Sequence, residues 1–172
     1  MTLPSYYNVS QFDITLPDGN DSLFLNEIAI TDVNGDGNLD AVLFYSVPPD
    51  AAAPVSAQIL LGDGAGNFAD GTAAVFGADV PQVVAPRELI VADFNGDGRP
   101  DIFVADTGED SASAPTYSNT LLLSSGATGY VNADSNLPNI SDYAHSATVA
   151  DINGDGAPDI FVGNVESAYE NG

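Results

Sequence analysis

The sequence predicts an all-β fold built from a repeated unit of about 60 residues, on three observations. One acidic motif occurs three times, as DVNGDGNLD at 32–40, DFNGDGRPD at 93–101 and DINGDGAPD at 151–159. The copies begin 61 and 58 residues apart. Short runs of β-branched and other apolar residues flank each copy, which is typical of strands rather than helices. Loops that join two strands at a fixed period indicate part of a β-propeller, made of four-stranded antiparallel blades.

The strands are expected in chain order around these loops. Residues 1–22 should hold one or two strands that close a preceding blade. Two whole blades follow at 23–83 and 84–141, and 142–172 is the first half of another. Within the whole blades, the expected strands are 26–31, 40–46, 57–61 and 67–73, then 88–93, 101–105, 119–124 and 130–131.

Each copy of the motif carries oxygen-bearing side chains at fixed positions. Asp or Asn stands at positions one, three and five, Gly at six and Asp at nine. Ca²⁺ takes several oxygen ligands at about 2.3–2.6 Å, and glycine at position six permits the sharp turn of such a loop. Position seven would contribute only its carbonyl, which fits its free variation. The predicted ligands are Asp32, Asn34, Asp36, Asn38, Asp40, Asp93, Asn95, Asp97, Arg99, Asp101, Asp151, Asn153, Asp155, Ala157 and Asp159.

We expect one Ca²⁺ per loop, three in all, in a structural role that fastens the strand before each loop to the strand after it. A metal-free turn is the alternative, since Asp, Asn and Gly dominate turns. That alternative leaves three carboxylates crowded together without a compensating cation. Mg²⁺ is disfavoured because it demands stricter octahedral geometry. An EF-hand is excluded because position twelve holds Leu43, Val104 and Val162 instead of a bidentate carboxylate.

With their flanking strands, these loops resemble the VCBS/FG-GAP repeats of integrin-α-like β-propellers, and the resemblance covers nearly the whole chain. It implies a calcium-binding, non-catalytic module of an extracellular protein that serves protein or cell-surface binding and adhesion. The sequence departs from the FG-GAP pattern where Ala105-Asp106 and Gly163-Asn164 replace the GAP tripeptide. The VCBS-like branch is therefore the closer match, and functions specific to integrins are not implied.

Charge and composition narrow the possible partners and location. The net charge is −23, with only two basic residues, so nucleic acid and anionic membranes would be repelled. Loops of this kind bind calcium weakly in extracellular modules, at roughly 10⁻⁴–10⁻³ M, which favours an extracellular or cell-surface location. The first residues do not form a signal peptide and no apolar run spans a membrane, so a piece of a longer secreted protein is expected.

A propeller ring needs at least four blades, so we expect the missing ones from the rest of the parent chain or from another subunit. Arg87 and His145, which align with Asn26 at the end opposite the acidic loops, are the candidate ligand-binding residues. Solvated side chains with local hydrogen bonds are the alternative for both. No catalytic residues are expected, because His145 has no recognisable nucleophile or acid partner. Lectin-like glycan binding, or a propeller attached to a polysaccharide-degrading enzyme, remain open alternatives.

Overall fold

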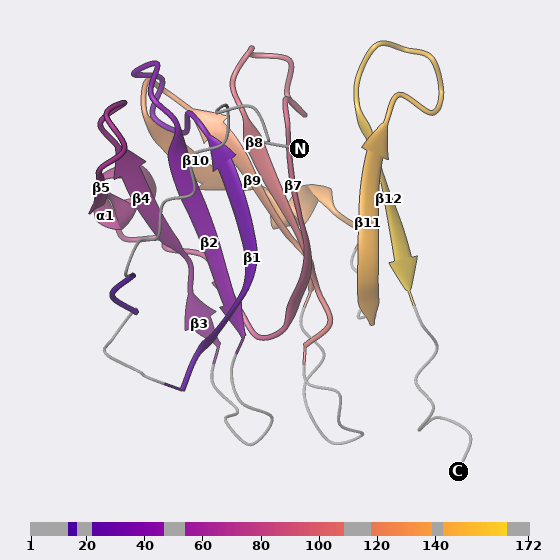
Figure 1. The fold of residues 1–172 in the computed structure, drawn as a ribbon. Helices are drawn as coiled ribbons and strands as arrows, with labels where there is room; N and C mark the ends of the chain where they lie inside the picture. Colours follow the sequence, from indigo (N-terminus) through magenta and orange to yellow (C-terminus); the bar gives the residue numbers. More distant parts are fainter. Residues whose placement is uncertain (1–13, 17–21, 47–53, 109–117, 139–142, 165–172) are drawn as a thin grey trace, which may run out of the picture.

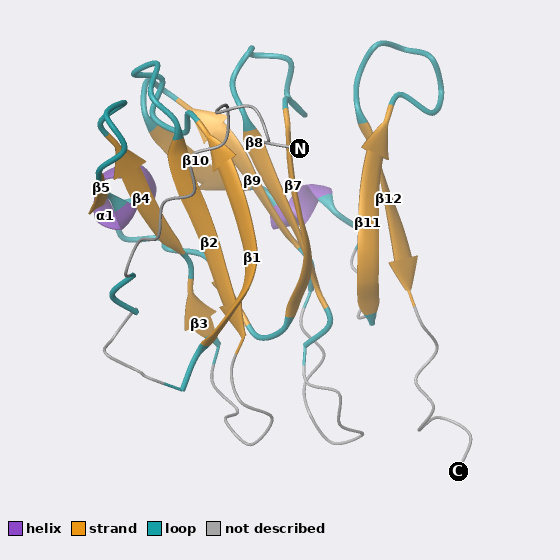
Figure 2. Cartoon of the chain, viewed as in Figure 1, coloured by secondary structure: helices purple, strands orange, loops and turns teal. Residues whose placement is uncertain are grey.

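The computed structural model describes residues 14–16, 22–46, 54–108, 118–138 and 143–164. Within these residues the chain is almost entirely β, and its main sheets stand side by side (Figures 1 and 2). Spatial order follows sequence order in each of them, so every sheet is an antiparallel meander like a propeller blade. No barrel is closed by the described strands. The predicted partial propeller is confirmed.

The first two sheets have four strands each and the third has two. The strands of the first sheet are β1 (Phe24–Thr31), β2 (Asp40–Ser46), β4 (Gln58–Gly62) and β5 (Phe68–Asp70). Those of the second sheet are β7 (Pro86–Ala92), β8 (Asp101–Asp106), β9 (Thr120–Ser125) and β10 (Gly129–Asn132). The third sheet pairs β11 (Ala144–Ala150) with β12 (Asp159–Asn164). The inner strands lie next to one another, β1 beside β7 and β7 beside β11.

The segments that follow β5 and β10 differ from the prediction. The strand expected to reach residue 73 ends at Asp70, and a short helix α1 (Thr72–Phe76) follows it. Thr72 causes this change, since its N–H and hydroxyl both bind the carboxylate of Asp70 at 2.9 and 2.7 Å. The 3₁₀ turn η2 (Asp134–Asn136) follows β10. A small pair of strands, β3 (Val55–Ser56) and β6 (Gln82–Val83), also lies outside the strands expected from the sequence.

Side chains from facing sheets form the core. Successive residues of a strand point to opposite faces, so Val42 and Phe44 of β2 meet Ile102 and Val104 of β8 in one buried cluster. Phe103, between the last two, points the other way and packs with residues of β11 and β12 in a second cluster. The sheets are thus joined by buried apolar contacts, and the loops at the strand ends are not part of this core.

Residues 14–16 are the described part of the predicted N-terminal strands, and they are not in a strand. Ile14 and Leu16 pack against the first sheet, at the cluster formed by Leu43 and Tyr45. The rest of those strands lies outside the described residues. The division at 23–83, 84–141 and 142–172 stays a prediction. No helix among the described residues is long and apolar enough to cross a membrane.

Candidate metal centre

The three acidic loops lie at one common end of the molecule, the upper end in Figure 1. They join β1 to β2, β7 to β8 and β11 to β12, the two innermost strands of each sheet. Each loop starts directly after one strand and its ninth residue begins the next, so both ends of the loop are anchored by the sheet. The loops therefore have the same position in every repeat.

Position one organises the backbone of each loop. The carboxylate of Asp32 accepts hydrogen bonds from the N–H groups of Gly35, Asp36 and Gly37 at 2.7–3.2 Å. The equivalent bonds measure 2.7–3.0 Å in the second loop and 2.7–3.1 Å in the third. Gly35 and Gly37 have φ angles of 75° and 88°, which favour glycine. The motif therefore curls the same way three times.

Side chains at positions three, five and nine approach one another. In the second loop, Nδ2 of Asn95 donates to Asp97 at 3.3 Å and to Asp101 at 3.4 Å. The corresponding asparagine donates to position five at 3.0 Å in the first loop and to position nine at 3.3 Å in the third. Its Oδ1 accepts the N–H of position five at 2.8–2.9 Å in all three. The side chain of position three therefore lies within hydrogen-bond distance of the carboxylate of position five or nine in every loop.

Position seven presents its backbone to the loop and its side chain to the outside. Its N–H donates to the carboxylate of position five at 2.7–2.9 Å in all three loops. The side chain of Asn38 lies over Gly64, and the guanidinium of Arg99 reaches the carbonyl oxygen of Gly126 at 2.6 Å. The backbone carbonyl is thus the atom that position seven can offer to a cation.

The aspartate at position nine has a second task. Asp40 and Asp101 are completely buried. The two oxygens of Asp40 accept the N–H groups of Val33 and Gly62, both at 2.9 Å. Asp101 is held by three backbone N–H groups at 2.6–3.0 Å, two from its own loop and one from β9. A buried carboxylate so bonded ties the loop to the third strand of its sheet.

The third strand and the turn after it also belong to the centre, and sequence reasoning missed them. The hydroxyl of Ser124 in β9 donates to Asp97 at 2.8 Å. Gly62 occupies the equivalent place in β4, since its N–H donates to Asp40 as the N–H of Ser124 donates to Asp101. No motif marks either residue, because the contact depends on how two hairpins of one sheet align.

The donor atoms fit a hard divalent cation. They are carboxylate, amide and carbonyl oxygens, which suit Ca²⁺. The hydrogen bond from Ser124 is the main cause that lowers the pKa of Asp97, and the N–H of Asn38 is the main cause that lowers the pKa of Asp36. Among the described residues, no three Asp, Glu, His or Cys side chains gather as a metal-binding group. Asparagine and backbone oxygens would therefore have to complete each ligand set.

Replacing Asp40 by Asn separates the structural task of position nine from ligation. The new side-chain amide would set an N–H₂ group against one backbone N–H, so we expect Asp40→Asn to lower the free energy of unfolding by about 2–3 kcal/mol even with EDTA present. Urea unfolding measures this loss. Asp36→Asn is the matched control, because Asp36 is exposed, and in EDTA it should change stability by less than about 0.5 kcal/mol. Equal losses of unfolding free energy in the two variants would contradict the structural role assigned to Asp40.

Arg87 and His145 lie at the other end of the inner strands, as does Asn26. All three are β-bulge residues, because the pairing of each inner strand with its neighbour skips them. Nδ2 of Asn26 donates to the carbonyl oxygen of Pro86 in the next sheet at 3.2 Å. Nε of Arg87 donates to the hydroxyl of Thr107 at 3.1 Å.

Thr107, which accepts the hydrogen bond from Arg87, also contacts the third sheet. Its hydroxyl donates to the carbonyl oxygen of Ala144 at 2.8 Å. Ala144 precedes the bulge residue of β11, as Pro86 precedes that of β7. Arg87 therefore has a local structural contact, to a threonine that itself bonds the third sheet, and His145 is exposed. Ligand binding by these two residues stays a prediction.

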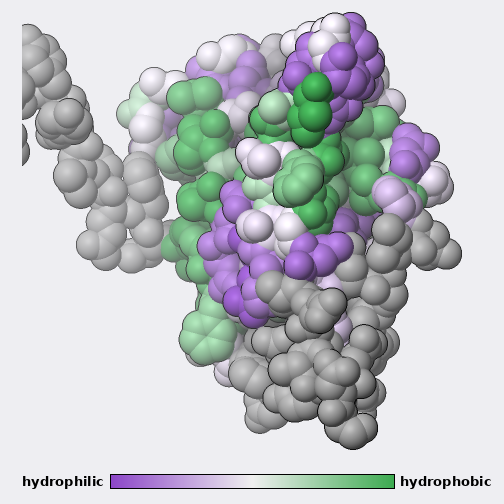
Figure 3. Space-filling model, turned by 90° about the vertical axis from the view of Figure 1, so that its right-hand side faces the viewer, coloured by the Kyte–Doolittle hydropathy of each residue, from purple (hydrophilic) through white to green (hydrophobic). Residues whose placement is uncertain are grey.

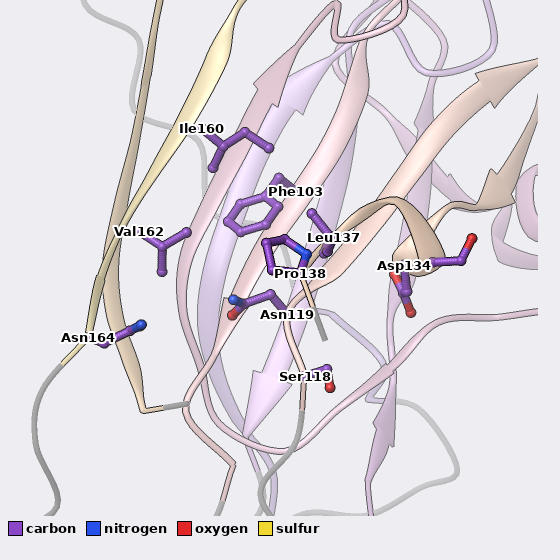
Figure 4. Close-up of a pocket in the computed structure, with 10 residues that line it drawn as sticks. Phe103, Ser118, Asn119, Asp134, Leu137, Pro138, Ile160, Val162 and Asn164 are labelled. Atoms are coloured by element: carbon purple, nitrogen blue, oxygen red, sulfur yellow. The ribbon is translucent and has the colours of Figure 1, made fainter. Parts of the chain in front are cut away.

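A pocket of about 560 Å³ lies between the second sheet and β12 (Figure 4). Two of its polar side chains already make hydrogen bonds, since Asn119 accepts the N–H of Asp106 at 3.1 Å and Asp134 that of Leu121 at 2.7 Å. Between the first and second sheets, by contrast, the space is filled, and Leu122 of β9 belongs to that buried cluster. Among the described residues, β12 pairs only with β11. The pocket thus marks incomplete packing between sheets.

The comparisons with known proteins agree with this repeated geometry. None of the curated proteins matches the chain. The family model described as FG-GAP-like repeat matches twice, over residues 32–104 and 93–162. Each match begins at position one of an acidic loop and ends shortly after the next loop, so together they cover all three loops. The chain therefore belongs to the FG-GAP-like repeat family.

Proposed function

We propose that each acidic loop binds one Ca²⁺ and that the three ions stabilise the sheets. The observation that carries this proposal is the hydrogen-bond network that recurs in all three loops. In each, the position-one carboxylate accepts the N–H groups of positions four, five and six. The position-three amide also bonds the carboxylate of position five or nine in each loop. The ion would neutralise carboxylates that otherwise repel one another. It would also join the two inner strands at the end where the sheet hydrogen bonds stop.

The proposed role is that of a non-catalytic binding or adhesion module of an extracellular protein. Family membership supports it, together with a loop type that needs the high calcium concentration found outside cells. The charge of −23 supports protein or glycan partners over nucleic acid and membranes. Segments near the bulge end of the inner strands, away from the cation loops, would carry the partner contacts.

We also propose that further blades cover the two outer faces of the described sheets, supplied by the rest of the parent chain or by another subunit. Phe161 is 62% exposed, whereas Phe103, at the same position of the second repeat, is 1% exposed. Ile28 and Ile30 of β1 are 54% and 53% exposed on the opposite outer face. Seen from the side of β11 and β12, hydrophobic residues gather in a strip on the surface (Figure 3). Such strips mark surfaces that pack against a partner.

Isothermal titration calorimetry tests the cation sites. Metal-free protein titrated with CaCl₂ should bind three ions. The control carries Asn at position five of every loop (Asp36→Asn, Asp97→Asn and Asp155→Asn) and should lose most of the binding heat while retaining its circular dichroism spectrum. Absence of binding by the native protein at millimolar calcium would reject the proposal.

The adhesion role needs its own test. Calcium-loaded protein and EGTA-treated protein are applied to immobilised extracellular-matrix proteins and to a glycan array. Calcium-dependent capture by a matrix protein supports the proposed role. Capture by glycans alone would replace it with lectin-like binding, and capture by neither would contradict both.

A further inference from the structure

Arg99 is one of only two basic residues in the chain, and its side chain lies between two of the acidic loops. Its Nη1 donates to the carbonyl oxygen of Gly126, in the β9–β10 turn, at 2.6 Å. Its Nη2 donates to the carbonyl oxygen of Val33, in the first loop, at 3.3 Å. Its Nε is buried and has no hydrogen-bond partner in the part of the chain that the structure describes. The two terminal nitrogens therefore hold the guanidinium in place.

The Val33 carbonyl is a sensitive point of the first loop. Val33 is position two, so its carbonyl belongs to the peptide group that leads into Asn34, the ligand residue at position three. The N–H of Val33 is bound by Asp40 at 2.9 Å, and its side chain is completely buried. The N–H and the side chain of Val33 are thus fixed, and the bond from Arg99 fixes its carbonyl group as well. Arg99 thus helps to orient the backbone between positions one and three.

At its other end, Arg99 is part of the second loop. Its N–H donates to Asp97 at 2.9 Å, and its carbonyl is the oxygen of position seven. The β9–β10 turn lies close to the first loop, since a Cβ placed on Gly35 would be 3.7 Å from the carbonyl oxygen of Ala127. Loop, turn and loop therefore form a continuous contact, and Arg99 is bonded to all three parts.

We propose that Arg99 is a positioning residue that couples cation binding at the first and second loops. Binding at the second loop immobilises the Arg99 backbone and hence the fork formed by its two terminal nitrogens, one of which holds the Val33 carbonyl. The first loop is then already ordered for its own ion and binds it more tightly. The third loop has Ala157 at this position, which has no side chain to make such a link. It is expected to bind independently. This inference rests on the calcium sites proposed above.

Simple electrostatics predicts the opposite effect of Arg99 on calcium affinity. A guanidinium close to carboxylates competes with a cation, so its removal would tighten binding at both neighbouring loops. Substitution by Lys distinguishes the two accounts, because Lys keeps the charge but cannot bond two carbonyl oxygens in a fixed fork. Coupling through the fork predicts weaker binding at the first loop in both Arg99→Lys and Arg99→Gln. The charge account predicts no change in Arg99→Lys and tighter binding in Arg99→Gln.

Glycine amides provide a separate signal for every loop. The N–H groups of Gly37, Gly98 and Gly156 each donate to the position-one carboxylate of their own loop, at 2.8, 2.8 and 3.0 Å. In a ¹⁵N–¹H correlation spectrum, CaCl₂ should move each signal with the dissociation constant of its loop. Arg99→Lys should raise the constant reported by Gly37 about fivefold or more, the lower end of coupling between sites. The constant reported by Gly156 should not change.

Arg87→Lys is the matched control, since Arg87 also makes a guanidinium hydrogen bond, to Thr107, but at the opposite end of the strands. It should leave the Gly37 titration unchanged. An Arg99→Lys protein with a native Gly37 titration, or an Arg99→Gln protein that binds calcium more tightly there, would overturn the coupling.

A second measurement needs no cation. In EDTA, the amide of Val33 should exchange with deuterium faster in Arg99→Lys than in the native protein, while the equivalent amide of Ile152 in the third loop should not. Unchanged exchange at Val33 would overturn the link itself. If native glycine signals do not respond to calcium, the proposed function has failed, and the exchange result still decides whether Arg99 positions the first loop.

Discussion

Removal of calcium is expected to lower the melting temperature of the protein by about 10 °C. A ligand present at ten times its dissociation constant stabilises the folded state by about 1.4 kcal/mol per site, so three sites give about 4 kcal/mol when any coupling between them is left out. In a domain of this size, 1 kcal/mol corresponds to roughly 2–4 °C. Differential scanning calorimetry in millimolar CaCl₂, and then in EGTA, measures the difference directly.

Two controls separate specific binding from general screening of the negative charge. MgCl₂ at the same concentration screens the charge of −23 equally well but fits the loops less well, so it should recover only a small part of the shift. The variant with Asn at position five of all three loops should melt at the same temperature with CaCl₂ and with EGTA. Equal effects of the two cations on the native protein would show that the loops are ordinary acidic turns.

The parts of the fold that could be predicted from the sequence are those set by local interactions. The network around Asp32 joins residues no more than five apart, so the nine-residue motif contains all the information that the loop needs. Alternation in runs such as 40–46 likewise records which side chains face a neighbouring sheet. The strands of the two complete sheets accordingly begin and end within three residues of the predicted positions.

The parts that could not be predicted depend on contacts between distant residues. The bond from Arg99 to Val33 spans 66 residues, and that from Gly62 to Asp40 spans 22. The alignment of Asn26, Arg87 and His145 located one equivalent position correctly, but no sequence signal showed that it is a bulge. The helix after Asp70 was missed partly for the same reason, because Thr72 also accepts the N–H of Ile59 and α1 lies against β4.

The run Gly62–Gly66 illustrates this limit, since as a sequence it marks only a hairpin turn. In the structure its first residue has a particular task. A Cβ on Gly62 would overlap the carbonyl oxygen of Leu39 and would lie 3.2 Å from the carbonyl carbon and 3.3 Å from the ring of Phe68. The N–H of Gly62 is bound by the buried Asp40 at 2.9 Å, so β4 is held against the first loop. Gly62 is therefore needed for close approach.

Gly62→Ala is accordingly expected to lower the free energy of unfolding by about 3 kcal/mol, the upper end of what overpacking usually costs. Leu39 directly precedes Asp40, which pairs with Thr31, and Gly62 pairs with Phe68, so neither residue can move without weakening the bonds to Asp40. Urea unfolding in EDTA measures the loss. Gly129→Ala is the matched control, because this strand glycine has room for a Cβ, whose nearest neighbours would lie 3.5 and 3.6 Å away.

The control should change stability by less than about 1 kcal/mol, since alanine in a strand replaces glycine at little cost where space allows. In Gly62→Ala, the first loop would be pushed from β4, so its calcium affinity should fall together with the stability while the third loop binds as before. A loss of stability without any change at the first loop would mean that the clash is absorbed within the β4–β5 turn. Neutral behaviour of Gly62→Ala would show that the loop and the hairpin are not in the close contact on which the geometry of the first cation centre depends.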